Sequence, residues 1–148
     1  VVQLGHWKRA HVIGTSSAAN LDYVRSLKAD EALDYQAAPF ESVVKDVDIV
    51  IDTVGGDLAQ RSLKVLRKGG IYVTVAGRLP DDAGKADGVR AERGGRATSD
   101  KLGEISKLVD AKELWPTPGR VFPLEEARQA QELSQTGHGR GRIILRIS

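Results

Sequence analysis

The sequence predicts an α/β fold built on a mostly parallel sheet. Short apolar runs alternate with helical stretches of about ten residues, which is the pattern of strand–helix–strand units. Residues 47–52 are almost continuously apolar, as is typical of a parallel strand that is buried on both faces. A chain of 148 residues is long enough to bury a hydrophobic core within one domain.

The first half of the chain carries the clearest strand–helix alternation. Strands are expected at residues 11–14, 31–35, 47–52 and 71–76. Helices are expected at residues 1–8, 20–28 and 57–67, with a short helix or turn at 39–45. The helix at 20–28 rests on the helical spacing of Leu21, Val24 and Leu27, and Gly69 and Gly70 are expected to stop the one at 57–67.

The second half is less regular. Residues 78–100 are rich in Gly, Asp and Arg and poor in apolar side chains, so they are expected to form a loop or a mobile segment. Further helices are expected at residues 100–112 and 124–135, and strands at 121–122 and 142–147.

Composition excludes several classes of function. The chain has no Cys, which excludes disulfides and thiolate zinc sites, and its His residues lack metal-ligand spacing, so no metal site is expected. There is no apolar run of transmembrane length and no visible signal peptide, so a cytoplasmic protein without membrane contact is expected. The net charge of +2 and the lack of aromatics among the basic residues 90–96 argue against a nucleic-acid partner.

Small and hydroxyl-bearing residues follow three of the expected strands. They are Gly14, Thr15, Ser16 and Ser17, then Thr53, Val54 and Gly55, and then Val75, Ala76 and Gly77. Ligands bind beyond the carboxyl ends of parallel strands, where small residues let a cofactor approach the backbone. The alternative is that these residues only form turns.

The first of these strand ends indicates which nicotinamide cofactor would bind. Proteins that bind NAD place an acid there for the ribose 2′-hydroxyl, and that acid repels a 2′-phosphate. Here Thr15, Ser16 and Ser17 stand at that position, which favours NADP(H). Tyr35 offers another hydroxyl for the same phosphate, unless it is an ordinary aromatic residue at a strand end. The sequence shows no pair of nucleophile and base, so it identifies no catalytic residue.

Four segments together resemble a known family. They read "AHVIGTSSAANLDYVRSLKADEALDY", "VDIVIDTVGG", "RSLKVLRKGGIYVTVAG" and "GRVFPLEEARQAQELSQTGHGRGRIILRI". They are similar to the C-terminal part of the medium-chain dehydrogenases/reductases, in the zinc-independent, quinone-oxidoreductase-like (zeta-crystallin-like) branch.

The resemblance implies a Rossmann-type doubly wound parallel sheet from an NADPH-dependent oxidoreductase. Such enzymes pass a hydride directly from the nicotinamide to a quinone or an activated enone or carbonyl, and they are often homodimers. The resemblance assigns Thr15, Ser16 and Tyr35 to the adenosine ribose and its 2′-phosphate, with Asn20 near that phosphate. It places Thr53, Val54 and Gly55 along the cofactor, and Val75, Ala76 and Gly77 near the nicotinamide ribose.

The chain also departs from that family pattern. The first Rossmann strand, its Gly-rich loop and a preceding barrel-like domain have no counterpart, so residues 1–148 are expected to be a partial NADP-binding domain. We expect either a larger parent protein or direct pairing of the strands at 11–14 and 47–52, and we expect the isolated chain to be inactive. The alternative functions are a non-catalytic nucleotide-binding remnant that acts through a partner and, less favoured, an RNA-binding protein.

Basic residues stand at four positions where the family pattern has Gly or Pro. They are Arg9, Lys28, Lys68 and Lys112. If these positions require a left-handed backbone, each base costs about 1 kcal/mol relative to Gly. Residues 92–96 replace an apolar strand that usually flanks the nicotinamide and contributes to dimer contacts, so that strand is expected to be lost.

Overall fold

The computed structural model describes residues 1–77, 79, 82–86, 88–137 and 140–147. The chain divides into two compact units, Val1–Thr98 and Ser99–Ser148. Seven strands lie in three all-parallel sheets within the described residues. The expected α/β class with parallel strands is therefore confirmed, although the strands are divided among three sheets.

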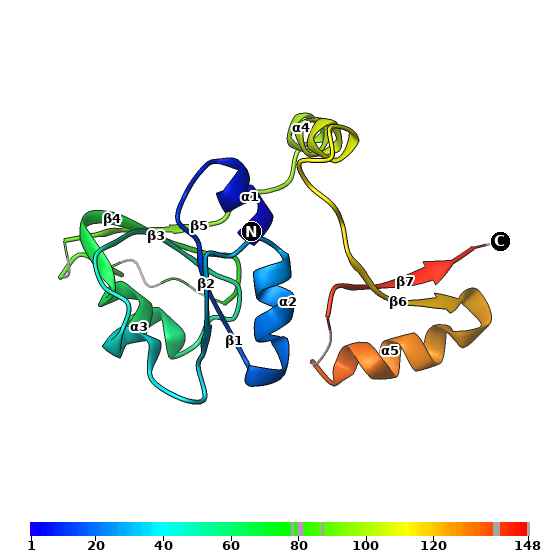
Figure 1. Cartoon of the computed structure of the whole chain (residues 1–148), viewed down its shortest axis with the longest axis horizontal. Helices are drawn as coiled ribbons and strands as arrows, with labels where there is room; N and C mark the ends of the chain where they lie inside the picture. The colour runs from blue at the N-terminus through cyan, green and yellow to red at the C-terminus, as the bar shows by residue number, and fades with distance from the viewer. Residues whose placement is uncertain (78, 80–81, 87, 138–139, 148) are drawn as a thin grey trace. The chain divides into compact units, whose positions relative to one another are not determined.

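The first sheet pairs two short strands in parallel. Strand β1 (Ile13–Ser16) runs beside β2 (Glu31–Asp34), with Thr15 opposite Leu33. Helix α1 (Val2–Trp7) precedes β1, and a 3₁₀ turn, η1 (Ala18–Asn20), leads into helix α2 (Leu21–Ser26). Figure 1 shows α2 alongside this strand pair. The absence of a Cβ at Gly14 makes room for α2, since a Cβ there would lie 2.6 Å from a methyl group of Val24.

The second sheet has the order β3–β4–β5. Strands β3 (Val47–Asp52), β4 (Leu66–Thr74) and β5 (Arg90–Arg93) are parallel, and helix α3 (Leu58–Leu63) packs on β3 and β4 (Figure 1). The 3₁₀ turn η2 (Phe40–Ser42) precedes β3. Strands β1 and β3 belong to different sheets, so the direct pairing between them, which was one of the two expected alternatives, does not form.

Strand β4 corrects the helix expected at residues 57–67. Helix α3 ends at Leu63, and β4 already begins at Leu66. Gly69 and Gly70 do not stop a helix. They lie in a register shift of β4, where Gly69 has a φ of 74° and a Cβ on Gly70 would lie 2.9 Å from the carbonyl oxygen of Arg67. The double glycine is thus needed because the backbone bulges here.

Strand β5 corrects the loop expected at residues 78–100. Arg90–Arg93 pair in register with Ile71–Thr74 of β4, so the strand expected to be lost is present. Val89 is buried just before it, and Ala91 packs beside Val89 in the core. Its exposed charged side chains suit an edge strand, because they discourage pairing with another chain. Residues 78, 80, 81 and 87 of this segment lie outside the described residues.

Two apolar clusters hold the first unit together. One consists of Phe40, Val44 and Val65, and partly buried side chains from both sheets pack against it. These are Ile13 and Leu33 of the first sheet, Val47 and Val50 of β3, and Leu58 of α3. The other consists of Leu63, Tyr72 and Val89. The two sheets of this unit therefore share a core.

Burial of β3 is one-sided, which corrects the expectation that both of its faces are covered. Val50 packs into the core, whereas Ile49 and Ile51 are 57% and 47% exposed. The apolar run therefore includes side chains on the exposed face of β3 as well as those in the core.

The second unit is a smaller strand–helix–strand arrangement. Helix α4 (Ser99–Asp110) is followed by β6 (Pro118–Pro123), the 3₁₀ turn η3 (Leu124–Glu126), helix α5 (Ala127–Gln135) and β7 (Arg142–Arg146). Strand β6 pairs with β7 in parallel, and α5 packs against them (Figure 1). Phe122 and Ala130 are buried in this unit. Strand β6 is longer than the expected 121–122, since it begins at Pro118.

The left-handed backbone expected at basic residues is present at three of the four positions. Arg9, Lys28 and Lys112 have φ angles of 59°, 74° and 60°. Lys68 does not adopt this conformation, because it lies within β4 and the positive φ falls on Gly69 instead.

Replacing Lys28 with Gly is expected to raise the free energy of unfolding by about 1 kcal/mol, because Gly adopts a positive φ without the Cβ strain. Lys68→Gly is the matched control, and it is expected to destabilise the protein by about 0.5–1 kcal/mol since it places a third Gly inside a strand. Urea unfolding of both variants makes the comparison. An equal change in the free energy of unfolding in the two variants would contradict the assignment of backbone strain to Lys28.

Candidate functional site

The candidate site lies at the carboxyl ends of the strands in the first unit. The structure gathers the twelve expected residues into two groups, one on each sheet of this unit. The first group is Gly14, Thr15, Ser16, Ser17, Asn20 and Tyr35. The second group is Thr53, Val54, Gly55, Val75, Ala76 and Gly77.

Parallel pairing brings the first group together. The backbone N–H of Tyr35, just past β2, donates to the carbonyl oxygen of Ser16 at the end of β1 (3.2 Å). The Asn20 side chain donates to the Ser17 hydroxyl oxygen (3.2 Å), and the Ser16 hydroxyl donates to the Ser17 carbonyl oxygen (3.2 Å). Tyr35 is 48% exposed, and Thr15 is also exposed. The end of β1 therefore presents neutral hydroxyl and amide groups. The Asp34 carboxylate lies opposite Ser16 at the end of β2, where it accepts a hydrogen bond from the N–H of Gln36 (2.9 Å).

The second group consists of two turns that touch each other. The backbone N–H of Val75 donates to the carbonyl oxygen of Asp52 (3.0 Å). Gly55 has a φ of 80°, and a Cβ on it would lie 3.2 Å from the carbonyl oxygen of Ala76. A side chain at position 55 would therefore press on the second turn and would be strained by the positive φ. Val54 and Val75 are 71% and 60% exposed, so this edge presents apolar side chains.

A buried carboxylate that sequence analysis left without a role stands beneath these turns. Asp52 is 6% exposed and ends β3. Its Oδ1 accepts hydrogen bonds from the N–H groups of Val54 (2.8 Å) and Gly55 (2.9 Å), and its Oδ2 accepts one from the Tyr72 hydroxyl (2.5 Å). The amides of Val54 and Gly55 are thus already occupied by Asp52, which weighs against their use as phosphate donors.

Opposing effects set the ionisation of this pair. Burial raises the pKa of Asp52, but the hydrogen bonds from Tyr72, Gly55 and Val54 outweigh it and hold that pKa below its ordinary value. Burial, with the hydrogen bond to Asp52, raises the pKa of Tyr72 to about 12. At neutral pH the Asp52 carboxylate is therefore ionised, and it accepts a hydrogen bond from the neutral hydroxyl of Tyr72.

The sequence indicates some of the Asp52 contacts but not the one with Tyr72. An Asp directly before a Thr-Val-Gly-Gly turn is typical of a side chain that accepts from amides two or three residues on. Tyr72 could not be found in this way, because its contact depends on the register that places Asp52 opposite Thr74.

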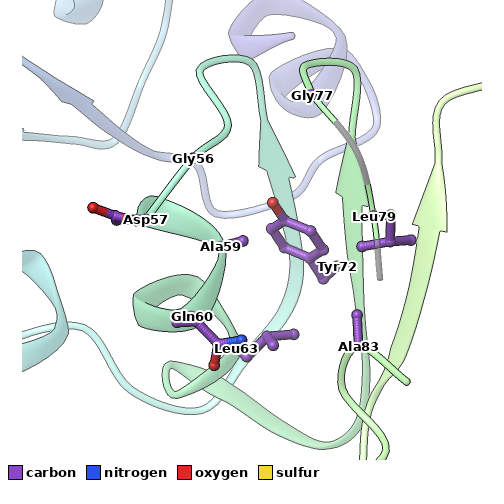
Figure 2. Close-up of a pocket in the computed structure, with 9 residues that line it drawn as sticks. All are labelled: Gly56, Asp57, Ala59, Gln60, Leu63, Tyr72, Gly77, Leu79 and Ala83. Atoms are coloured by element: carbon purple, nitrogen blue, oxygen red, sulfur yellow. The ribbon is translucent and has the colours of Figure 1, made fainter. Parts of the chain in front are cut away.

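A cavity of about 350 Å³ adjoins Tyr72, between α3 and the segment after β4. Figure 2 shows the Tyr72 ring between Ala59 of α3 and Leu79, while the Asp57 carboxylate points away from the ring. Gly77 is the one expected site residue in its lining, which consists of Gly56, Asp57, Ala59, Gln60, Leu63, Tyr72, Gly77, Leu79 and Ala83. The expected cofactor residues and this cavity therefore overlap only at the end of β4.

The described residues contain neither a metal-binding cluster of side chains nor a helix able to cross a membrane. Within the described ranges, no three His, Asp or Glu side chains are placed to share a metal ion. His11 instead hydrogen-bonds to Glu31 (2.8 Å), and this contact raises its pKa. In the same part of the chain, no helix combines the length and apolar character needed to cross a membrane.

Comparison with known proteins identifies the family. Residues 27–145 match the family model described as zinc-binding dehydrogenase, so the chain belongs to that family. The resemblance to medium-chain dehydrogenases/reductases is thereby confirmed. The family description names zinc, but the residues that the structure describes do not provide a zinc site.

Three relatives illustrate the range of similar proteins. The mouse mitochondrial NAD(P)H oxidoreductase RTN4IP1 is 30% identical, over 93% of this chain and 42% of its own length. The chloroplastic NADPH-dependent alkenal/one oxidoreductase of Arabidopsis thaliana is 26% identical, over 98% of this chain and 36% of its own length. The quinone oxidoreductase structure from Coxiella burnetii has a TM-score of 0.90 at 31% identity, over 99% of this chain and 48% of its own. The chain thus spans less than half of each of these proteins.

Proposed function

We propose that this chain is the cofactor-binding portion of an NADPH-dependent, zinc-independent oxidoreductase that acts on quinones or activated enones and carbonyls. The names of the relatives support an NAD(P)H-linked oxidoreductase. The observation that carries the choice of NADPH is the end of β1. Ser16, Ser17 and Tyr35 meet there, and no carboxylate follows β1 to repel a 2′-phosphate.

The two edges are proposed to hold different parts of the cofactor. The hydroxyl and amide groups of Thr15, Ser16, Ser17, Asn20 and Tyr35 suit the adenosine ribose and its 2′-phosphate, because they are hydrogen-bonding groups without negative charge. The turns of Val54 and Val75 suit the flatter, less charged nicotinamide end. When bound, NADPH supplies a hydride to the quinone or enone, and a proton from solvent completes the reduction.

Calorimetric titration with NADPH and NADH tests the proposal. We expect the chain to bind NADPH more tightly than NADH. Ser16→Asp is expected to weaken NADPH binding at least about tenfold and to spare NADH, because its carboxylate would face the 2′-phosphate. Ser42→Asp adds the same charge at an exposed position of η2 and serves as the control. Equal binding of the two cofactors, or binding of neither, would contradict the proposal.

The 148-residue chain alone is expected to show no measurable oxidation of NADPH by a quinone. Positioning of both reactants supplies much of an enzyme's rate. We propose that the substrate pocket needs segments that the relatives have and that this chain does not span. A homodimer and a cytoplasmic location remain predictions, and the name of the mouse relative places that protein in mitochondria.

A further inference from the structure

The contacts of Asp52 connect both turns of the second group to one buried point. Its side chain accepts hydrogen bonds from the N–H groups of Val54 and Gly55, and its backbone carbonyl oxygen accepts one from the N–H of Val75. On the neighbouring strand, the buried Thr74 hydroxyl donates to the Ala76 carbonyl oxygen (2.6 Å) and accepts from the Ala76 N–H (3.1 Å). Each turn therefore has its own side-chain clamp, and Asp52 joins the two turns.

Tyr72 is an unusual partner for this carboxylate. It comes from the middle of the second sheet, and at 1% exposed it is among the least accessible side chains described. Burying a phenol and a carboxylate together carries a desolvation cost that a pair of apolar side chains would avoid. Packing alone therefore does not account for the pair, but a requirement for one fixed geometry at the end of β3 does.

The hydrogen bonds to Asp52 determine which groups of the two turns stay available to a ligand. The inward amides of Val54 and Gly55 turn the side chain of Val54 outward, and the contact between Gly55 and Ala76 keeps the two turns together. Val54 and Val75 then stand exposed on adjoining turns. The negative charge of Asp52 stays beneath them, where three donors compensate it.

We infer that the Tyr72 hydroxyl and the Asp52 carboxylate form a positioning pair that fixes the two turns carrying Val54 and Val75 in the conformation that receives the cofactor. The inference rests on the proposed function for its ligand, but the order of the turns is measurable without any ligand. Tyr72 acts through Asp52 in this account and need not touch the cofactor itself.

Tyr72→Phe tests the inference, because it removes only the hydroxyl and keeps the buried ring. Amide hydrogen exchange, followed by NMR, is expected to accelerate about tenfold at Val54 and Gly55 while the amides of β2 keep their rates, since only the local hydrogen bonds are weakened. NADPH affinity is expected to fall about tenfold in the same variant. Tyr23→Phe, on α2, removes a hydroxyl outside this cluster and is expected to change neither readout.

Two outcomes separate the inference from the proposed function. Wild-type exchange rates at Val54 and Gly55 in Tyr72→Phe would overturn the inference, whatever the chain binds. Failure of the unmodified chain to bind NADPH would overturn the proposed function, while faster local exchange would still support the positioning of the turns. If Tyr72→Phe does not fold, Asp52→Asn replaces it. That variant keeps an oxygen acceptor, so a smaller acceleration at the same two amides is expected, and none would overturn the inference.

Discussion

Phe40→Ala is expected to lower the free energy of unfolding by about 3–4 kcal/mol, the range for removing a buried aromatic ring. Phe40 lies in the cluster where the first sheet, through Ile13 and Leu33, meets β3. Truncation would leave a cavity between the two sheets that carry the two halves of the candidate site. Arg61 also lies over the ring, 4.9 Å from its centre, and would lose that contact.

Chemical denaturation measures the effect, and Val43→Ala is the matched control. Val43 is three residues further along and 64% exposed, so its truncation is expected to cost no more than about 0.5 kcal/mol. If Phe40→Ala destabilises no more than this control, the shared core between the two sheets does not exist as described.

Asp52→Ala is expected to cost about 3 kcal/mol, because the Tyr72 hydroxyl and the N–H groups of Val54 and Gly55 lose a charged acceptor in a buried place. The matched control is Asp48→Ala on the same strand. The Asp48 side chain is 73% exposed and pairs with Arg67 at the surface, where an ion pair contributes little.

The loss should also depend on pH in one direction. The pKa of Asp52 is lower in the folded protein than its ordinary value, so its ionised form contributes stability above about pH 4. That contribution is lost as the pH falls through the lower, folded-state pKa. The difference in unfolding free energy between the wild type and Asp52→Ala should therefore be largest near neutral pH and shrink in acid. A difference that grows in acid would contradict the ionised state of Asp52.

Sequence patterns predicted the element order apart from β5, because the patterns are local. Strand β3 was predicted at its observed bounds, and the strand at β2 was predicted within one residue. The left-handed backbone at Arg9, Lys28 and Lys112 was also predictable, because it follows from their places at element ends.

Features that depend on partners far along the chain were not predictable in the same way. Strand β5 is charged, and its pairing with β4 depends on the burial of Val89 and the packing of the partly buried Ala91 rather than on its own composition. The double glycine of β4 is compatible with a helix end or a bulge, and only the pairing with β3 decides between them.

The candidate site was predictable in its outline, since small and hydroxyl-bearing residues near strand ends can be recognised in sequence. The expectation that they follow the strand was wrong for Gly14, Thr15 and Ser16, which lie within β1. Their grouping into a polar and an apolar edge was not, because it needs the register of two separate sheets. Whether these residues bind a cofactor stays a prediction.

Mapping NADPH onto the chain by amide chemical shifts tests the central claim most directly. Resonances of the described residues are compared with and without NADPH. The account predicts shifts concentrated at Thr15, Ser16, Ser17 and Tyr35 and in the turns that follow β3 and β4, with little change in the unit that contains β6 and β7. Shifts confined to that second unit, or to the basic residues of β5, would contradict it.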